Sequence, residues 1–324
     1  MSTSPQREKV REHVRAPGPH GTGRTRGAGG AVALIAATAL APAAWGTTYA
    51  VTTELLPPGH PLFAAVMRSL PGGLLLMLLT RVLPRGAWWW KSVVLGGLNI
   101  GAVYALLFVA AELLPGGVAG TLAAIQPIMV AGLAVAVLRE RVSVWRIGWG
   151  IAGAVGVGLV ILGPSARLDG VGVLAGLAGA GSMALGIVLT KHWGRPVGVG
   201  PGTLAGWQLT TGGLVLLPLM VLFEGAPPQL DGAAVTGYLW LGTVGGFIAH
   251  VLWFRGIGRL PVTATGMLVL LSPLVAALIG ALMLGEAFTP GQLAGFGLAL
   301  VALLAGQSDP GQRPAAREVR NVRR

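Results

Sequence analysis

Long apolar runs alternate with short connectors along this sequence, and that alternation limits the fold more than any other feature. Hydrophobic residues make up 53% of the 324 residues and charged residues only 10%, whereas soluble domains carry about 25% charged residues. A membrane-spanning helix needs about 20 mainly apolar residues. Ten runs have that character: 31–52, 62–80, 91–111, 117–138, 146–163, 170–190, 203–223, 234–254, 262–284 and 290–306. We therefore predict an all-α polytopic membrane protein with ten transmembrane helices.

Positive charges gather at both ends of the chain and in alternate connectors. Residues 1–30 hold six Lys/Arg, and residues 307–324 hold five Arg. With the N-terminus inside, the inner segments hold 21 Lys/Arg and the outer loops one, and such an excess marks the cytoplasmic side. The sequence thus predicts a multi-pass protein of the cell inner (plasma) membrane. A disordered basic tail at 1–30 and a basic tail at 307–324 would both be cytoplasmic.

The same charges bear on which partners the chain can have. A net charge of +12 could indicate a nucleic-acid partner. Short basic clusters beside apolar runs instead favour contact with anionic membrane lipid, so we expect membrane lipid and no nucleic acid as a partner. The chain has no cysteine, which excludes disulfides, thiol catalysis and thiolate metal sites.

The second half of the chain repeats the pattern of the first half. Residues 104–160 align with residues 250–306 at a constant offset of 146, and the earlier spans align at an offset of 140. Because each half has five spans, an odd number, the two halves enter the membrane in opposite directions. We predict two inverted five-helix repeats, 31–163 and 164–306, an arrangement found in many secondary transporters. The alignments pair Pro127 with Pro273, Glu140 with Glu286, Tyr104 with His250, Phe108 with Phe254 and Arg68 with Gln208.

Several segments, taken in order, resemble a known family. They are "AAWGTTYAVT" at 43–52, Arg68, the stretch "LPGGVAGTLAAIQPIMVAGLAVAVLRE" from Leu114, and its echo "LPVTATGMLVLLSPLVAALIGALMLGE" from Leu260. Together they are similar to the EamA-type branch of the drug/metabolite transporter superfamily. Arg139 stands where that family usually has Gly before the Glu. The resemblance implies ten helices and a central cavity formed largely by the third, fourth, eighth and ninth.

Arg68 is the strongest candidate for a substrate contact. It lies inside the second span, where an ionisable side chain is costly and usually has a purpose. We interpret it as a cation that faces the cavity and attracts an anionic group such as a carboxylate. The alternative is an arginine that reaches outward to the membrane surface or bonds to backbone carbonyls of a neighbouring helix.

Other polar and aromatic side chains could line the same path. His250 lies inside the eighth span, and its unperturbed pKa near 6.5 would suit a proton relay; the alternative is a histidine bonded at a packing surface. Aromatic rings with polar tips suit the walls of a site for an amphipathic solute, although they also pack against lipid or other helices. The remaining candidates on the substrate path are Tyr104, Phe108, Gln126, Gln208, Trp253 and Ser272.

Two pairs of residues are candidates for helix bends and gates. Pro127 and Pro273 each lie about ten residues into a span, where a missing amide donor can bend a helix. Glu140 and Glu286 lie near helix ends on opposite sides of the membrane under the predicted topology. We interpret each carboxylate as a helix-end anchor or as part of a gate that forms when one side closes.

The repeat and the resemblance together predict a secondary transporter that works by alternating access. The resemblance implies amino acids, amino-acid-like metabolites or small drug-like compounds as substrates, more often exported than imported. A membrane-embedded enzyme or a lipid-handling protein is the alternative, but an enzyme of this kind should cluster acids, histidines or metal ligands near one face. The sequence shows no such cluster, so we predict no enzymatic activity, no cofactor and no metal. Assembly into a homo-oligomer is left open.

Overall fold

The computed structural model describes residues 28–113, 122–140, 143–161, 169–284 and 288–308, and in these ranges every regular element is a helix. The elements η1 and η2 are π-helical segments. In chain order the elements are α1 Ala28–Gly46, α2 Thr48–Leu55, α3 Pro61–Thr80, α4 Trp88–Gly96, η1 Gly97–Gly101, α5 Ala102–Leu113, α7 Gln126–Leu138, α8 Val144–Ile161, α9 Gly170–Trp193, α10 Pro201–Phe223, α11 Gly232–Trp240, η2 Leu241–Ile248, α12 Ala249–Ile257, α13 Val262–Leu268, α14 Leu271–Leu284 and α15 Pro290–Gln307.

Eight stretches of the described chain are long and apolar enough to cross a membrane. Two further apolar helices, Gln126–Leu138 and Val144–Val160, are shorter than that length. They lie where the sequence predicted spans 117–138 and 146–163, and both predicted spans extend into residues that are not described. The prediction of an all-α, multi-pass membrane protein is therefore confirmed for the described residues, whereas the count of ten full spans is not reached.

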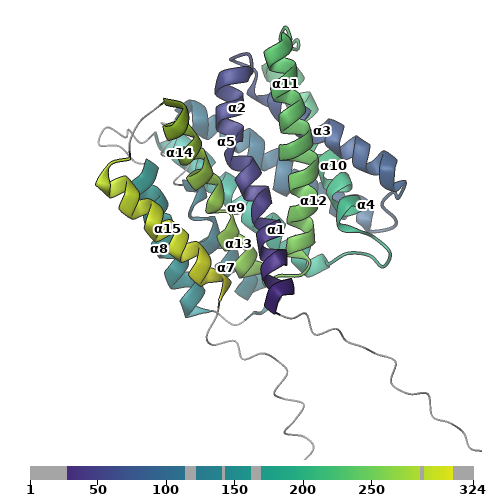
Figure 1. Cartoon of the computed structure of the whole chain (residues 1–324). Coiled ribbons are helices and arrows are strands. Elements are labelled where there is room, and N and C mark those ends of the chain that lie inside the picture. Colours follow the sequence, from purple (N-terminus) through teal and green to yellow (C-terminus); the bar gives the residue numbers. More distant parts are fainter. Residues whose placement is uncertain (1–27, 114–121, 141–142, 162–168, 285–287, 309–324) are drawn as a thin grey trace, which may run out of the picture.

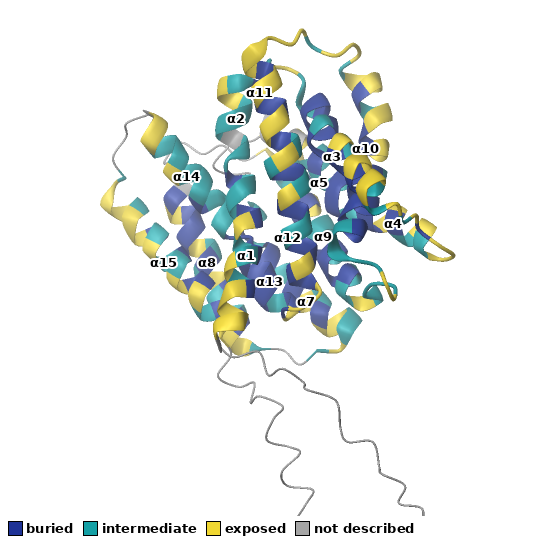
Figure 2. Cartoon of the chain, turned by 45° about the vertical axis from the view of Figure 1, so that its right-hand side comes forward, coloured by how far each residue is buried: buried dark blue, intermediate teal, exposed yellow. Residues whose placement is uncertain are grey.

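The outer surface of the helices suits a lipid environment. Large apolar side chains such as Leu78, Leu222 and Phe223 are exposed, and exposed residues lie along the outward faces of the helices (Figure 2). The first turn of α1 and the last turn of α15 lie toward the same end of the molecule (Figure 1).

Helices from the two halves pack against each other in pairs. Helix α3 packs on α10, and α8 packs on α15. Helix α1 packs on α12 and α14, while α9 packs on α5 and α7. A Cβ atom at Gly73 would collide with the backbone of Thr210, and one at Gly213 would collide with Leu70. Glycine at these two positions therefore lets the backbones of α3 and α10 approach closely, which replaces the hydrophobic driving force that lipid removes.

The helical conformation is interrupted just before each of the paired prolines. Helix α13 ends at Leu268 and α14 begins at Leu271, which places Pro273 in the first turn of α14. Pro127 likewise lies in the first turn of α7. A proline is well tolerated there because the first amides of a helix have no partner within the helix. At both prolines the structure thus has the start of a helix and not a bend within a continuous one.

Polar side chains bind free backbone groups at two helix ends. The Glu224 carboxylate accepts hydrogen bonds from the N–H groups of Leu62 and Phe63 at the start of α3, the latter at 2.8 Å. The Lys191 ammonium donates to the carbonyl oxygens of Ile257 at 3.2 Å and Leu260 at 3.0 Å, at the end of α12. Both contacts satisfy groups that a helix leaves unpaired at its ends.

Candidate functional site

Arg68 lies within α3 and is buried among helices of both halves. Its side chain is 8% exposed, and its Nε has no hydrogen-bond partner. The guanidinium carbon lies 4.9 Å from the centre of the Tyr104 ring on α5. A cation over an aromatic face gains some stabilisation, but a buried charge still costs free energy unless an opposite charge or hydrogen bonds compensate it. Among the described residues no ion pair with Arg68 is found, so the guanidinium is only partly compensated.

The π-helical segment η2 borders the other side of the Arg68 guanidinium. A Cβ atom at Gly245 would lie 3.5 Å from Arg68 Nε. Glycine therefore faces the unpaired nitrogen without offering a side-chain acceptor. The Trp45 indole donates a hydrogen bond of 3.0 Å to the carbonyl oxygen of Gly245, which uses that backbone group. The residue that faces Nε from η2 thus has no side chain.

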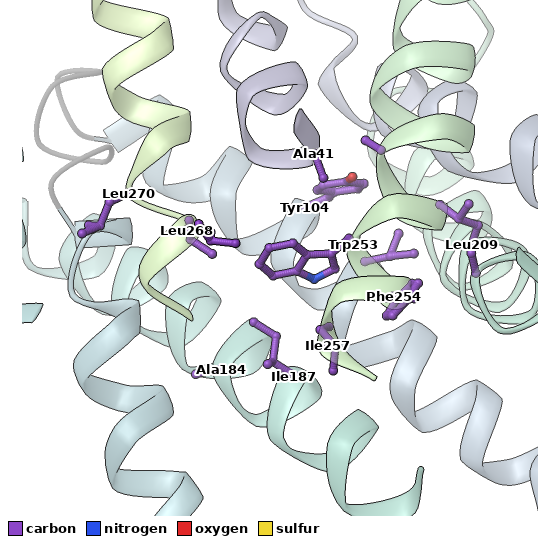
Figure 3. Close-up of a cluster of buried hydrophobic side chains, with 14 of the residues drawn as sticks. Ala41, Tyr104, Ala184, Ile187, Leu209, Trp253, Phe254, Ile257, Leu268 and Leu270 are labelled. Carbon is purple, nitrogen blue, oxygen red and sulfur yellow. The ribbon is translucent and has the colours of Figure 1, made fainter. Parts of the chain in front are cut away.

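Aromatic side chains from α1 and α12 lie next to this position. The Trp45 ring centre is 5.3 Å from that of His250 and 5.2 Å from that of Trp253. Trp253 and Tyr104 belong to one cluster of buried side chains at the centre of the molecule (Figure 3). His250 Nδ1 lies 2.8 Å from the carbonyl oxygen of Gly246, so Nδ1 carries the proton of this bond and Nε2 is left for other contacts. The structure therefore brings together the predicted residues Arg68, Tyr104, His250 and Trp253.

Gln208 on α10 belongs to a separate amide and hydroxyl cluster. Its Oε1 accepts a 2.7 Å hydrogen bond from Asn99 Nδ2, which is also 3.4 Å from Thr190 Oγ1. Gln208 is fully buried, and its Nε2 has no partner. Thr190 in turn donates to the carbonyl oxygen of Gly186 at 2.7 Å. This cluster ties α10 to η1 and α9.

Gln126 and Ser272, two further predicted path residues, show no such grouping with Arg68 among the described contacts. Gln126 is 2% exposed at the start of α7, and its Nε2 has no partner. Ser272 is half-buried in α14, where its backbone lies against Gly46 of α1. Phe108 lies in α5, and its side chain is outside the described set.

Of the two predicted carboxylate gates, only Glu140 belongs to the described residues. Glu140 follows Arg139, the residue that caps the end of α7. Its carboxylate interacts electrostatically with the ammonium group of Lys191. Glu286 lies outside the described residues. Arg139 ends α7 in the left-handed conformation, with φ 54° and ψ 29°. This is the conformation that glycine adopts most readily at a helix end, which gives a physical reason for the Gly usual at this position in the resembling family.

Asn99, Trp45 and Gly245 are among the residues of these clusters that were not sequence candidates. Asn99 was detectable, because an asparagine inside an apolar run is as conspicuous as a glutamine. Trp45 falls in the segment that carries the family resemblance, but its position gave no sign that it contacts η2. Gly245 is one of 53 glycines, and only the structure shows that it faces Arg68. Within the described part of the chain, no group of three or more His, Asp or Glu could hold a metal ion.

The sequence pattern of the EamA-like transporter family matches residues 32–162 and 170–305, which is most of the chain. The chain belongs to the EamA-like transporter family. It is therefore a membrane protein of a transporter family. The family pattern thus matches the chain twice, with the junction between 162 and 170.

Two curated proteins are similar to this chain in sequence, and one solved structure is similar to it in fold, each over most of the chain. Protein PecM of Dickeya dadantii (strain 3937) is 42% identical over 267 residues, which is 82% of this chain and 90% of PecM. A chloroplastic WAT1-related protein of Arabidopsis thaliana is 31% identical over 276 residues, covering 80% of this chain and 66% of that protein. One solved crystal structure superposes with a TM-score of 0.70 at 19% identity, covering 90% of this chain and 99% of that one. That last likeness concerns the fold alone.

Proposed function

We propose that the chain is a secondary transporter that carries a small metabolite with an anionic group across the membrane by alternating access. Arg68 is the observation that supports this function. It is a buried cation whose Nε is unpaired, next to a tyrosine ring and a glycine. A carboxylate or a similar group on the substrate would supply the compensation that the described residues lack.

The helix pairings support two inverted five-helix repeats, 31–163 and 164–306. At the offsets of 140 and 146, α3 corresponds to α10 and α8 corresponds to α15, and both pairs are in contact. The packing of α1 on α12 and α14 corresponds to the packing of α9 on α5 and α7. Two halves related by a pseudo-two-fold axis would produce these reciprocal contacts, and such halves can rock against each other around a central site.

The direction of transport and the membrane follow from sequence arguments. Resemblance to the family favours export of amino-acid-like or drug-like compounds. The excess of Lys/Arg in the inner segments favours the cell inner (plasma) membrane with both termini cytoplasmic. The first turn of α1 and the last turn of α15 lie toward the same end of the molecule, which supports that topology (Figure 1).

Glu140 and the paired prolines are proposed to take part in gating. Glu140 acts electrostatically on Lys191, which itself holds the end of α12 through two carbonyl oxygens. Glu140 therefore connects α7 of the first half with the α9–α12 contact of the second. The helix is interrupted just before Pro127 and again just before Pro273, so each proline lies in the first turn of a new helix, α7 or α14. Small changes in backbone angle at such an interruption can redirect the helix that follows.

A binding screen followed by a transport assay tests the proposal directly. The purified protein would be tested for thermal stabilisation by a library of metabolites, and each hit would then be followed in proteoliposomes. Losing a hydrogen-bonded charge contact costs about 1.5–3 kcal/mol, so we expect Arg68→Ala to lower the apparent affinity for the hit by at least about tenfold. Arg68→Lys should recover part of that loss because it keeps the charge without the guanidinium fork.

The exposed Arg85 serves as a matched control, since Arg85→Ala removes a cation outside the buried cluster. Normal transport by both Arg68 variants, at normal protein levels, would remove the binding role of Arg68. Chemical conversion of the hit without movement across the vesicle membrane would favour the membrane-enzyme alternative instead.

A further inference from the structure

A small cavity lies between α1 and α12, at the end of the molecule where α1 begins. It has a volume of about 170 Å³, and its lining consists of Gly30, Ala33, Leu34, Ala37, Arg255 and Arg259. One wall is therefore apolar and comes from α1, and the other carries two arginines at the end of α12. A water molecule occupies about 30 Å³ in the liquid, so the cavity has room for a group larger than one water.

The two helices that line this cavity pack closely against each other. A Cβ atom at Gly256 would collide with the side chain of Thr38, so α12 lies directly against α1 just beside the cavity. Thr38 is fully buried and donates a 2.7 Å hydrogen bond to the carbonyl oxygen of Leu34. Five of the six lining residues therefore lie on two packed helices, and Arg259 lies in the turn that follows α12.

Positive charge surrounds the end of α12. Arg255 and Arg259 are four residues apart and both exposed, and both reach the cavity. A Cβ atom at Gly258 would lie 3.6 Å from Arg195 Nε, which adds a third guanidinium beside the same turn. Lys191 donates to the carbonyl oxygens of Ile257 and of Leu260 just beyond α12, and brings a fourth cation that has Glu140 as a counter-charge. Arginine is the residue best suited to binding a phosphate by paired hydrogen bonds.

We propose that this cavity binds the phosphate group of an anionic phospholipid. The arginines would hold the headgroup, and the wall of Gly30, Ala33 and Ala37 would accept the adjoining glycerol and the start of the acyl chains. The apolar wall decides between a lipid and a free phosphate ion, because an ion gains nothing from it. The position at the end of two membrane helices places the site where headgroups lie, and basic pockets between helices on the cytoplasmic side are suited to such lipids. This site is separate from the Arg68 cluster and does not depend on the proposed function.

Lipid titration of the purified full-length protein tests the site. Phosphatidylglycerol would be added to the protein in a neutral detergent, with phosphatidylcholine as the uncharged comparison, while thermal stability and the lipid retained in native mass spectrometry are measured. We expect phosphatidylglycerol to raise the melting temperature and to stay bound, and phosphatidylcholine to do neither. Each basic residue near a membrane surface contributes a modest electrostatic attraction, so Arg255→Gln and Arg259→Gln should each weaken the apparent affinity by about fivefold.

Two further variants distinguish lipid binding in the cavity from attraction of the lipid to the protein's net positive charge. Ala33→Leu fills the apolar wall and keeps both arginines, so it should also weaken binding of phosphatidylglycerol. Arg85→Gln removes an exposed cation that does not line the cavity, so it should leave binding unchanged.

Three results would overturn the proposal. Stabilisation of the protein by inorganic phosphate to the same extent as by the lipid would identify a site for a soluble anion. Ala33→Leu could bind the lipid as tightly as the unchanged protein, which would show that the cavity is not occupied. Arg85→Gln could weaken binding as much as the cavity variants, which would indicate attraction to net charge alone.

Discussion

The two halves of the chain place different chemistry at corresponding positions. Arg68 on α3 corresponds to Gln208 on α10 at the offset of 140, and Asn99 in η1 corresponds to Gly245 in η2 when the offset of 146 is extended five residues upstream of Tyr104. Gln208 meets Asn99 in a 2.7 Å hydrogen bond, whereas Arg68 meets Gly245, which has no side chain to offer. The first contact is a side-chain hydrogen bond within the protein, although Gln208 Nε2 beside it has no partner; its counterpart lacks a side-chain acceptor and leaves a cation open.

This difference teaches how a repeat can combine rigidity with binding. A neutral amide pair that is internally bonded fixes the relative position of two helices. A buried guanidinium with an unpaired nitrogen costs free energy, and under the proposed function an anionic group of the substrate compensates it. The closed contact is accordingly interpreted as structural and the open one as the substrate contact, and each can be tested alone.

The largest expected effect concerns the closed contact. Asn99→Ala leaves Gln208 Oε1 buried without a donor, so we expect the free energy of unfolding to fall by about 1–3 kcal/mol. Thermal unfolding in detergent would measure the loss. A double-mutant cycle with Gln208→Ala should give a coupling energy above about 0.5 kcal/mol. Fully additive effects would show that the amide pair is not a stabilising unit.

The next effect concerns the open contact. Gly245→Asn would place an amide acceptor beside Arg68, and a Cβ atom at this position fits at 3.5 Å from Nε without displacing the backbone. An internal partner would compete with the substrate, so we expect transport to fall by about tenfold, equivalent to roughly 1.4 kcal/mol. Gly245→Ala is the control, since it adds volume without an acceptor and should cost less. Unchanged transport by Gly245→Asn would argue against substrate binding at this nitrogen.

A smaller effect should distinguish the starts of α3 and α10. The Glu224 carboxylate bonds to two free N–H groups of α3, whereas the residue before α10, Gly200, has no side chain to serve as a cap. Glu224→Ala should therefore lower the free energy of unfolding by about 1 kcal/mol, and Glu224→Gln by less, because an amide oxygen can still accept. Equal losses in both variants, seen by thermal unfolding, would show that the carboxylate does not act through this cap.

The smallest effect should be a gain in stability. Arg139 holds a positive φ of 54° at the end of α7, whereas the second half has Gly285 at the corresponding position of the sequence. Arg139→Gly should raise the free energy of unfolding by about 0.5–1 kcal/mol, because glycine adopts this conformation without a steric cost. Arg139→Ala keeps the Cβ and should bring no gain. A gain from alanine as large as that from glycine would assign the effect to charge and not to the backbone.

Sequence patterns predicted most of the helices but not all of their ends. Apolar runs are visible because lipid demands about 20 such residues per span, and eight of them recur as long helices. The break between α13 and α14, inside the predicted span 262–284, was not predicted. Val269 and Leu270 at that break are as apolar as their neighbours, so the hydrophobic pattern does not distinguish a turn from a helix there.

The candidate site was predicted in its residue types and only partly in its grouping. Arg68, Tyr104, His250 and Trp253 were singled out because polar or aromatic groups are rare in apolar runs, and the structure brings them together. Gln208 was singled out for its place in the repeat, and it lies instead in the cluster of Asn99.

The sequence by itself determined that this chain is a helical membrane protein with two similar halves, because hydrophobic length and internal similarity are properties of the linear chain. Only the tertiary structure decided that Arg68 meets Gly245 while Gln208 meets Asn99. These contacts join residues more than 100 positions apart, and they depend on how closely glycines let helices approach. The presence of a charge can be read along the chain, but whether that charge has a partner is a property of the packed helices.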